Sequence, residues 1–202
     1  MERITSIDGV EGMPLALRFR RWRNHPGPGI DFPDISTMAT DATALRQVTD
    51  ALGRRLSAET SVVAGLDIGG LGIAGALAYR NSLGLLDIRK VDAIRAGVIR
   101  SIMENYELGD GVAVSRAQRI AQSTVAIVDD CLMTGQTALA GIALLRRLGA
   151  RCDTAIFVFE LEGMQGRTLL EDAGIAVHSL LRLPQSDSED AAFSEVESPS
   201  CP

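Results

Sequence analysis

The stretch from Thr124 to Ala138, TVAIVDDCLMTGQTA, constrains the fold of this chain more than any other. Its apolar first half predicts a buried strand at 124–128, which ends at two adjacent carboxylates, Asp129 and Asp130. The turn that follows opens a predicted helix, so its backbone N–H groups and the positive end of the helix favour a phosphate group. The carboxylates can accept hydrogen bonds from hydroxyl groups of the same ligand. The stretch therefore predicts a sugar phosphate site at the end of a strand.

The apolar pattern elsewhere alternates between strands and helices. A length of 202 residues suits one domain, and 46% hydrophobic with only 4% aromatic residues suits helices around buried parallel strands. The pattern predicts helices at residues 37–56 (with Thr40, Asp41 or Thr43 as the cap), 70–79, 137–148 and 166–172, and strands at residues 61–66, 83–88, 124–128, 154–161 and 176–183. This alternation favours an α/β fold with a doubly wound, mostly parallel sheet. The polar stretch 90–118, with a strand-like piece at 112–114, predicts a long loop or small hairpin that acts as an active-site lid.

A glycine-rich stretch follows the first predicted strand. Residues 65–75, GLDIGGLGIAG, contain the pattern G-x-G-x-x-G, which in dinucleotide-binding folds lets the backbone approach a diphosphate. Asp87, near the end of the next predicted strand, would then be the acid that binds the ribose. The dinucleotide interpretation leaves the loop at 124–138 and the long segment before the first strand unexplained. We therefore interpret residues 65–75 as a second phosphate-binding turn.

The acidic residues are unevenly distributed. The formal net charge is −6, and five acids fall in a stretch at 185–202 without basic residues: Asp187, Glu189, Asp190, Glu195 and Glu197. This composition predicts a disordered acidic tail at 185–202. The rest of the chain is nearly neutral and lacks the basic excess typical of nucleic-acid binding, so we expect no nucleic-acid partner. The local cluster at 18–23, RFRRWR, is interpreted as part of a dimer interface or of a hood near the acceptor.

The cysteines and histidines form no recognisable metal or disulfide pattern. Cys131, Cys152, Cys201, His25 and His178 lie far apart in the sequence, so we expect neither a disulfide framework nor a zinc site. Cys131 is interpreted as a small apolar residue rather than as a nucleophile. The sequence shows no signal-peptide core and no apolar run long enough for a membrane span, so we expect a cytoplasmic protein without a membrane partner.

Several stretches resemble one enzyme family. The apolar strand, acid pair and T-G-x-T loop at 124–137 resemble the signature of the type I phosphoribosyltransferases, which binds 5-phosphoribosyl 1-diphosphate. The likeness is closest to the adenine phosphoribosyltransferases and spans about Pro28 to Leu183. Three further stretches carry it: PGIDFPDI at 28–35 is similar to the family's P-G-x-x-F-x-D-I, ELEGMQGR at 160–167 to its E-L-x-x-L-x-G-R, and Arg89-Lys90, which holds the only lysine in the chain, to its Arg-Lys pair.

The resemblance implies a domain layout and a set of roles. One domain would span 1–184, with a hood at about 1–36 and a flexible lid at about 90–118, followed by the tail. The donor's ribose and 5-phosphate would be bound by Asp129, Asp130, Met133, Thr134, Gly135, Gln136 and Thr137, and its diphosphate by Asp67, Ile68, Gly69, Gly70, Arg89 and Lys90. The acceptor would contact Ile30, Phe32 and Pro33, and Asp130 with a lid glutamate, Glu104 or Glu107, would act in catalysis. The resemblance also implies a homodimer and Mg²⁺ bound mainly through the donor, with no direct protein ligand.

Two positions depart from the family pattern. Gly69 stands where the family has an arginine in its E-x-R-G-F stretch, and Pro33 stands where it has an arginine between Phe and Asp. A diphosphate leaving group requires positive charge around it. Here that charge would come from the Arg-Lys pair and the lid, namely Arg89, Lys90, Arg95 or Arg100. Three hypotheses stay open: transfer to adenine or a related purine, transfer to a non-purine acceptor in a specialised biosynthetic pathway, and a non-catalytic sensor of the donor.

Overall fold

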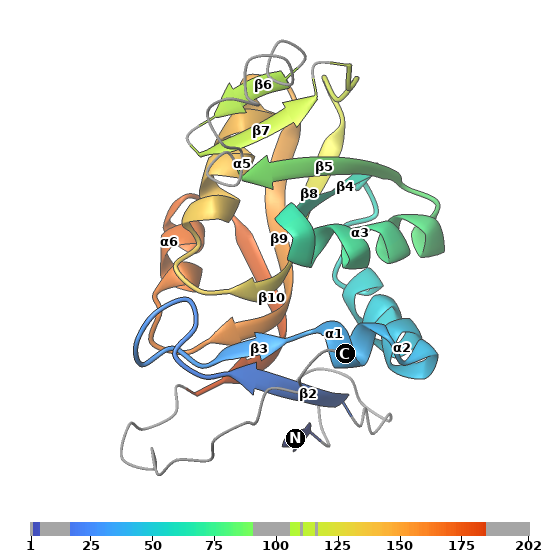
Figure 1. Cartoon of the computed structure of the whole chain (residues 1–202). Coiled ribbons are helices and arrows are strands. Elements are labelled where there is room, and N and C mark those ends of the chain that lie inside the picture. The colour runs from blue at the N-terminus through green and yellow to red at the C-terminus, as the bar shows by residue number, and fades with distance from the viewer. Residues whose placement is uncertain (1, 5–16, 91–105, 110, 116, 185–202) are drawn as a thin grey trace, which may run out of the picture.

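A seven-stranded sheet forms the centre of the structure (Figure 1). The computed structural model describes residues 2–4, 17–90, 106–109, 111–115 and 117–184. The strands of this sheet are β4 (Val62–Leu66), β5 (Gly84–Lys90), β6 (Tyr106–Gly109), β7 (Val112–Ser115), β8 (Thr124–Leu132), β9 (Arg151–Leu161) and β10 (Ala176–Leu183). Their order is β10-β9-β8-β4-β5-β7-β6. The strands from β10 to β5 pair in parallel, and β7 and β6 continue the sheet as an antiparallel hairpin. The predicted α/β fold with a mostly parallel sheet is confirmed.

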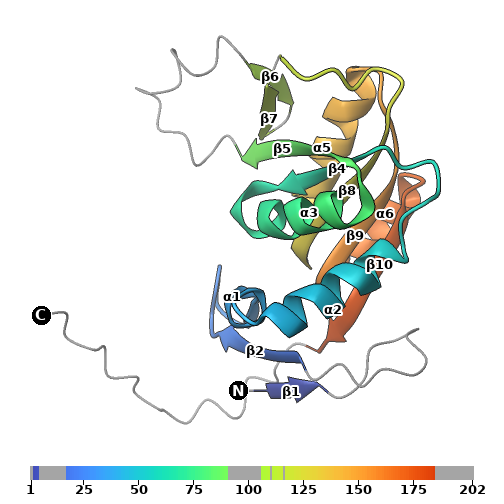
Figure 2. The ribbon, with the colours of Figure 1, turned by 90° about the vertical axis from the view of Figure 1, so that its right-hand side faces the viewer.

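Helices cover both faces of this sheet (Figure 2). The helices are α2 (Ala42–Gly53) and α3 (Asp67–Asn81) on one face, and α5 (Gln136–Arg147) and α6 (Gly166–Asp172) on the other. Side chains alternate along the strands, so Val63 and Ala126 pack with α2 and α3 while Ala64 and Ile127 pack with α5 and α6. The sheet therefore has an apolar core on each face, as expected for a doubly wound fold.

A small antiparallel sheet precedes the central one. It consists of β1 (Glu2–Ile4), β2 (Leu17–Trp22) and β3 (Phe32–Asp34), in that order. Phe19 of β2 is buried against the ring of Phe159 at 5.0 Å between centroids, and Arg21 Nη1 donates to Pro184 O at 2.9 Å. Figure 1 shows this sheet at the opposite end of the molecule from the β6–β7 hairpin. An N-terminal element of the kind predicted as a hood is thus present.

Several predicted boundaries were wrong. The helix predicted at 37–56 is two helices, α1 (Ser36–Ala39) and α2, because Asp41 caps the second one by accepting from Thr43 N at 2.8 Å and Ala44 N at 3.0 Å. The strand predicted at 154–161 begins at Arg151, where β9 pairs with Thr124 at the start of β8.

The lid prediction is only partly within the described residues. The hairpin alternative is correct for its second half, since β6 and β7 pair with each other and β7 pairs with β5. Residues 91–105, 110 and 116 lie outside the described residues, and with them Glu104, Arg95 and Arg100. The acidic tail at 185–202 also lies outside them.

Candidate functional site

The candidate site lies where β8 leads into α5. The predicted strand at 124–128 continues to Leu132, because its last residues keep their parallel register with β9. The two carboxylates, Asp129 and Asp130, therefore lie within the strand rather than beyond it. The chain then turns into α5 through Gly135, whose φ of 74° is a left-handed conformation that favours glycine. This turn places the start of α5, a helix of twelve residues, shortly after the strand end that carries the carboxylate pair.

One cavity of about 390 Å³ gathers most of the predicted donor-binding residues. Its lining includes Asp67, Gly69 and Lys90 from the predicted diphosphate set, and Asp129, Asp130, Met133, Thr134, Gly135, Gln136 and Thr137 from the predicted ribose and phosphate set. Phe32, from the predicted acceptor set, lines it as well. Segments far apart in the sequence thus meet around one space, as the carboxyl ends of adjacent parallel strands do in doubly wound sheets.

The electrostatics of the carboxylate pair are unusual. Burial raises the pKa of Asp129 well above its ordinary value, and the charge of the neighbouring Asp130 raises it further. Burial also raises the pKa of Asp130. Two contacts oppose these effects: the backbone N–H of Asp130 donates to Asp129 Oδ1 at 2.9 Å, and the charge of Lys90 lowers the pKa of both carboxyls. The pair therefore takes its second negative charge at an energetic cost, which a ligand with positive charge or hydroxyl donors would reduce.

The first turn of α3 packs directly against this pair. The helix begins at Asp67, which has a left-handed φ of 48°, rather than at the predicted residue 70. A Cβ on Gly69 would lie 2.5 Å from Asp130 Oδ2, and a Cβ on Gly70 would lie 2.5 Å from Val128 O. Neither distance is compatible with a side chain at these positions, so the absence of one lets the helix start approach β8. With Asp130 in this position, an arginine does not fit at position 69.

The remaining predicted residues lie around the cavity rather than in its wall. The side chain of Ile68 is 89% exposed, and Gly70 is buried beneath the helix turn. The guanidinium of Arg89 pairs with Asp87 through Nε and Oδ2 at 2.7 Å. The backbone of Glu107 lies in β6 opposite Val114, and the structure does not describe the side chain of this residue.

The predicted acceptor residues are divided between the cavity and the core. Phe32 reaches the cavity, whereas Ile30 packs against the core cluster and Pro33 is buried in β3 opposite Arg21. A second cavity of about 580 Å³ shares Phe32, Gly69 and Asp130 with the first. Gly69 thus lies at the border between the two cavities.

Sequence reasoning missed part of the cavity wall. Pro26, Leu66, Cys131, Leu132, Ala138 and Phe157 also line it. Pro26 follows a cis peptide bond in the turn before β3, and no sequence pattern pointed to this turn. Cys131 and Leu132 could have been found by extending the apolar strand past the acid pair.

Cys131 has the properties of a packing residue. It is buried, and burial together with the nearby charges of Asp130 and Asp129 raises the pKa of its thiol.

Among the residues that the structure describes, no group of three or more His, Cys, Asp or Glu side chains is arranged to hold a metal ion. In the same part of the chain, every helix is too short or too polar to cross a membrane.

Comparison with known proteins assigns the chain to a family. A model of the phosphoribosyl transferase domain matches residues 38–172, and the chain therefore belongs to the phosphoribosyl transferase domain family. The adenine phosphoribosyltransferase of Paracoccus denitrificans is 40% identical over 159 residues, which cover 77% of this chain and 83% of the relative. The adenine phosphoribosyltransferase of Beijerinckia indica is 34% identical over 172 residues, which cover 83% of this chain and 96% of the relative.

Solved structures show the same similarity. The crystal structure of adenine phosphoribosyltransferase from Thermoanaerobacter pseudethanolicus matches with a TM-score of 0.70 at 28% identity, covering 82% of this chain and 95% of that chain. The enzyme of the same name from Rhodothermus marinus matches with a TM-score of 0.70 at 29% identity, covering 82% and 94%. The predicted relationship to the type I phosphoribosyltransferases, nearest the adenine type, is confirmed.

Proposed function

We propose that this protein is a phosphoribosyltransferase that transfers the 5-phosphoribosyl group of 5-phosphoribosyl 1-diphosphate to adenine or a related purine and releases diphosphate. The observation that carries the proposal is the single cavity in which the acid pair, the loop at 133–137 and Lys90 meet. Adenine phosphoribosyltransferases with 34% and 40% identity over most of the chain support the purine acceptor.

The loop and the carboxylates bind different parts of the donor in this proposal. The 5-phosphate accepts hydrogen bonds from backbone N–H groups of the loop at 133–137, aided by the positive end of α5. Asp129 and Asp130 accept hydrogen bonds from the ribose hydroxyls. As the bond to diphosphate breaks, positive charge grows on the sugar ring, and Asp130 stabilises it electrostatically.

The leaving diphosphate requires positive charge, and the described lining of the donor cavity offers one basic side chain, Lys90. Lys90 therefore faces the diphosphate, and the first turn of α3 at 67–70 contributes backbone N–H groups. Arg89 lies next to it in β5, held by Asp87, and completes the predicted diphosphate set.

Mg²⁺ fits the chemistry of this site. The cavity lining holds three carboxylates, Asp67, Asp129 and Asp130, which are oxygen ligands suited to Mg²⁺, and the described residues contain no cluster that would form a complete protein cage. A Mg²⁺ ion held mainly by donor oxygens would suit this arrangement, and the cavity carboxylates would be the protein groups able to contact it or its water ligands. Bound there, the ion would neutralise charge on the diphosphate.

The acceptor side rests on fewer contacts. Phe32 lines the donor cavity and provides an aromatic face for a base, and Ile30 and Pro33 complete the proposed acceptor set. A lid formed by about 90–118 excludes water, and Glu104 or Glu107 acts as the base that removes the purine proton. The full layout we propose is a hood at about 1–36, this lid, one domain at 1–184, and a disordered acidic tail at 185–202.

One observation favours the alternative acceptor. Gly69 and Pro33 remove two positive charges that the family pattern places near the site, and the neighbouring cavity of about 580 Å³ opens at Gly69. A non-purine acceptor in a specialised biosynthetic pathway would use that space. A non-catalytic sensor of the donor is the remaining hypothesis, and it predicts donor binding without turnover.

We further propose a cytoplasmic homodimer that binds neither nucleic acid nor membrane. The outer face of α3 and the adjacent strand expose Tyr79 (91%), Ile68 (89%) and Leu85 (50%). Exposed large apolar side chains are often buried in protein interfaces. We therefore propose that Tyr79 and Leu85, which lie outside the predicted diphosphate set, are part of the dimer contact.

Diphosphate release from the donor with Mg²⁺ tests the function, with adenine, other purines and a panel of non-purines offered separately. Release with adenine that is abolished in Asp130→Asn, and kept in the surface control Asp172→Asn, is the expected result. Donor binding by calorimetry without release for any purine would shift the conclusion to the alternatives. Absence of donor binding would refute the proposal altogether.

A further inference from the structure

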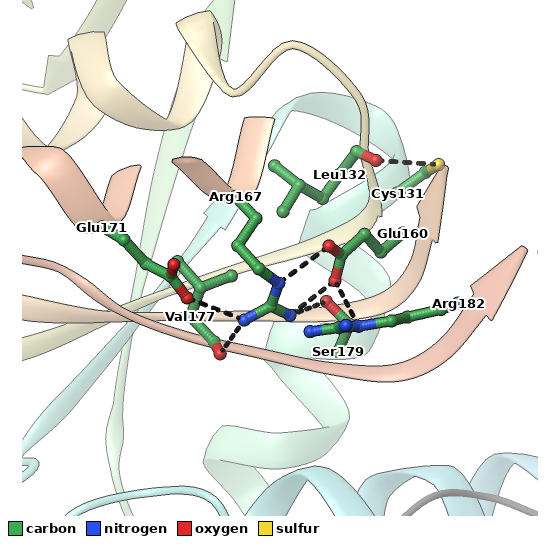
Figure 3. Close-up of polar contacts among 8 residues, drawn as sticks. All are labelled: Cys131, Leu132, Glu160, Arg167, Glu171, Val177, Ser179 and Arg182. Atoms are coloured by element: carbon green, nitrogen blue, oxygen red, sulfur yellow. Dashed lines mark hydrogen bonds and ion pairs between the residues drawn. The ribbon is translucent and has the colours of Figure 1, made fainter. Parts of the chain in front are cut away.

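Arg167, the second residue of α6, is held by an unusually complete set of hydrogen bonds (Figure 3). Its Nε donates to Glu160 Oε1 at 2.8 Å and its Nη2 to Glu160 Oε2 at 2.5 Å. The other donations go to Glu171 Oε1 at 3.0 Å, Val177 O at 2.9 Å and Ser179 Oγ at 3.4 Å. A guanidinium has five N–H donors, and here each one has an acceptor. A lysine cannot reproduce this arrangement.

Glu160 ties this arginine to the strand beside the site. Its side chain is only 9% exposed, and in the sheet register it lies between Leu132 of β8 and Arg182 of β10. Burial acts to raise the pKa of Glu160, but hydrogen bonds from Arg167 and Ser179 bring it below its ordinary value. The carboxylate is therefore ionised and holds the guanidinium in place, while Arg182 approaches from the outer side with Nε at 3.5 Å.

Gly166, the residue before Arg167, packs directly against the proposed phosphate loop. A Cβ on Gly166 would overlap Met133 O and lie 2.8 Å from Leu132 Cδ1. A Cβ on Gly135 would lie 2.9 Å from Gly166 O. Glycine at both positions thus allows the backbone of the loop to rest directly on the backbone at the start of α6.

These contacts link Glu160 in β9 to the loop at 133–135 through Arg167 and the first turn of α6. Glu160 fixes Arg167, Arg167 fixes the first turn of α6, and that turn supports the loop between Met133 and Gly135. We propose that Arg167 is a positioning residue for the loop that binds the 5-phosphate of the donor, which rests on the function proposed above for that loop. Neither Arg167 nor Glu160 lines the donor cavity, so the effect acts through the loop backbone.

The test compares Arg167→Lys and Glu160→Gln with the matched control Arg182→Lys, which alters the other guanidinium on the same carboxylate. Amide hydrogen exchange at residues 133–137 of the ligand-free protein is measured first, with α2 as an internal reference. We expect exchange in the loop to be about tenfold faster in both test variants and unchanged in the control, with α2 unaffected. Unchanged loop exchange in a folded Arg167→Lys protein would overturn the proposal.

Donor affinity and kinetics provide the second readout. Calorimetry with 5-phosphoribosyl 1-diphosphate should show a Kd raised about tenfold in the test variants, since small misplacements of binding groups are costly. The KM for the donor should rise with it, while the KM for the acceptor stays unchanged. Equal losses for donor and acceptor would contradict a role specific to the loop. If the unaltered protein binds no donor, the proposed function fails, and the hydrogen-exchange result alone decides whether Arg167 supports the loop.

Discussion

Replacement of Asp129 by asparagine should stabilise the free protein while weakening donor binding. Asn has the same shape, and its Oδ1 can still accept the N–H of Asp130, so the substitution removes only the buried charge. Because burial raises the pKa of Asp129 in the folded state, the free energy of unfolding falls as pH rises from the unfolded value of 3.8 toward the folded one. Above the pKa of the folded state, the free energy of unfolding has fallen by the full amount.

The size of the gain follows from the pKa difference between the folded and unfolded states. Each pKa unit corresponds to about 1.4 kcal/mol at neutral pH. For a chain of this length, a change of about 1 kcal/mol shifts Tm by roughly 2–4 °C. The variant should therefore melt about 3 °C higher, or more, for each unit by which burial raises the pKa. The lost attraction to Lys90 reduces this gain, but Lys90 is exposed, so its contribution is small.

Thermal unfolding of both proteins at pH 7.5 and pH 4, without ligand, measures the effect. The gain in Tm should be large at pH 7.5 and nearly absent at pH 4, where Asp129 is protonated in the folded state. Asp172→Asn, on the exposed surface of α6, should show no such pH dependence. A variant less stable than the parent at pH 7.5, or equally stabilised at both pH values, would refute the argument. Donor affinity at pH 7.5 should fall at least tenfold, since an amide accepts sugar hydroxyls less strongly than a carboxylate.

Three other substitutions test the site and its surroundings. Gly69→Arg, which restores the family residue, should lower stability by about 1–3 kcal/mol and slow diphosphate release, because its Cβ displaces Asp130; faster release would contradict this. Cys131→Ala should keep kcat within about twofold, and iodoacetamide at pH 8 should leave Cys131 unmodified in the folded protein, because burial raises the pKa of its thiol; rapid labelling would show that it is accessible. Tyr79→Glu should convert the dimer to monomers in sedimentation experiments, and an unchanged mass would place the interface elsewhere.

The strongest sequence prediction was the strand, acid pair and helix around 124–137. Its success has a physical basis, since a buried parallel strand must be almost wholly apolar and a phosphate loop needs a fixed order of turn residues. The boundaries of α6 and β10 were also correct, because apolar periodicity and Gly174 between them mark both ends. The structure of these segments can therefore be predicted from their own residues, without knowledge of distant contacts.

Other features depend on partners distant in sequence. Strand β2, LRFRRW, resembles a basic cluster in the sequence, and only its pairing with β1 and β3 and the burial of Phe19 against Phe159 show that it is part of a packed sheet. The bonding of Arg167 draws on groups from β9, α6 and β10, so the E-L-x-x-L-x-G-R resemblance could locate the residue without indicating what it does. The acceptor contacts stay predictions for the same reason.

The start of α3 shows how a local pattern can be misread. The sequence predicted a phosphate-binding turn in GLDIGGLGIAG and a helix only from residue 70, whereas α3 begins at Asp67, so that Gly69 lies within the helix together with Gly70, Gly72 and Gly75. A Cβ on Gly72 would meet nothing within 4 Å, whereas a Cβ on Gly69 would displace the Asp130 side chain and a Cβ on Gly70 would overlap the backbone of β8. The glycines at the start of α3 therefore indicate close packing of a helix against the acid pair, and they do not indicate a loop.

The same principle operates on both sides of the donor cavity. Gly69 and Gly70 bring the start of α3 against the acid pair, and Gly135 and Gly166 bring the phosphate loop against the start of α6. Missing side chains at these four positions let backbone pack closely against its neighbours in and beside the cavity wall. Backbone held in this way is preorganised for the fixed geometry of a sugar phosphate. Lys90 is the one basic side chain on the described wall, so in the proposed function it is the main local positive charge for the diphosphate.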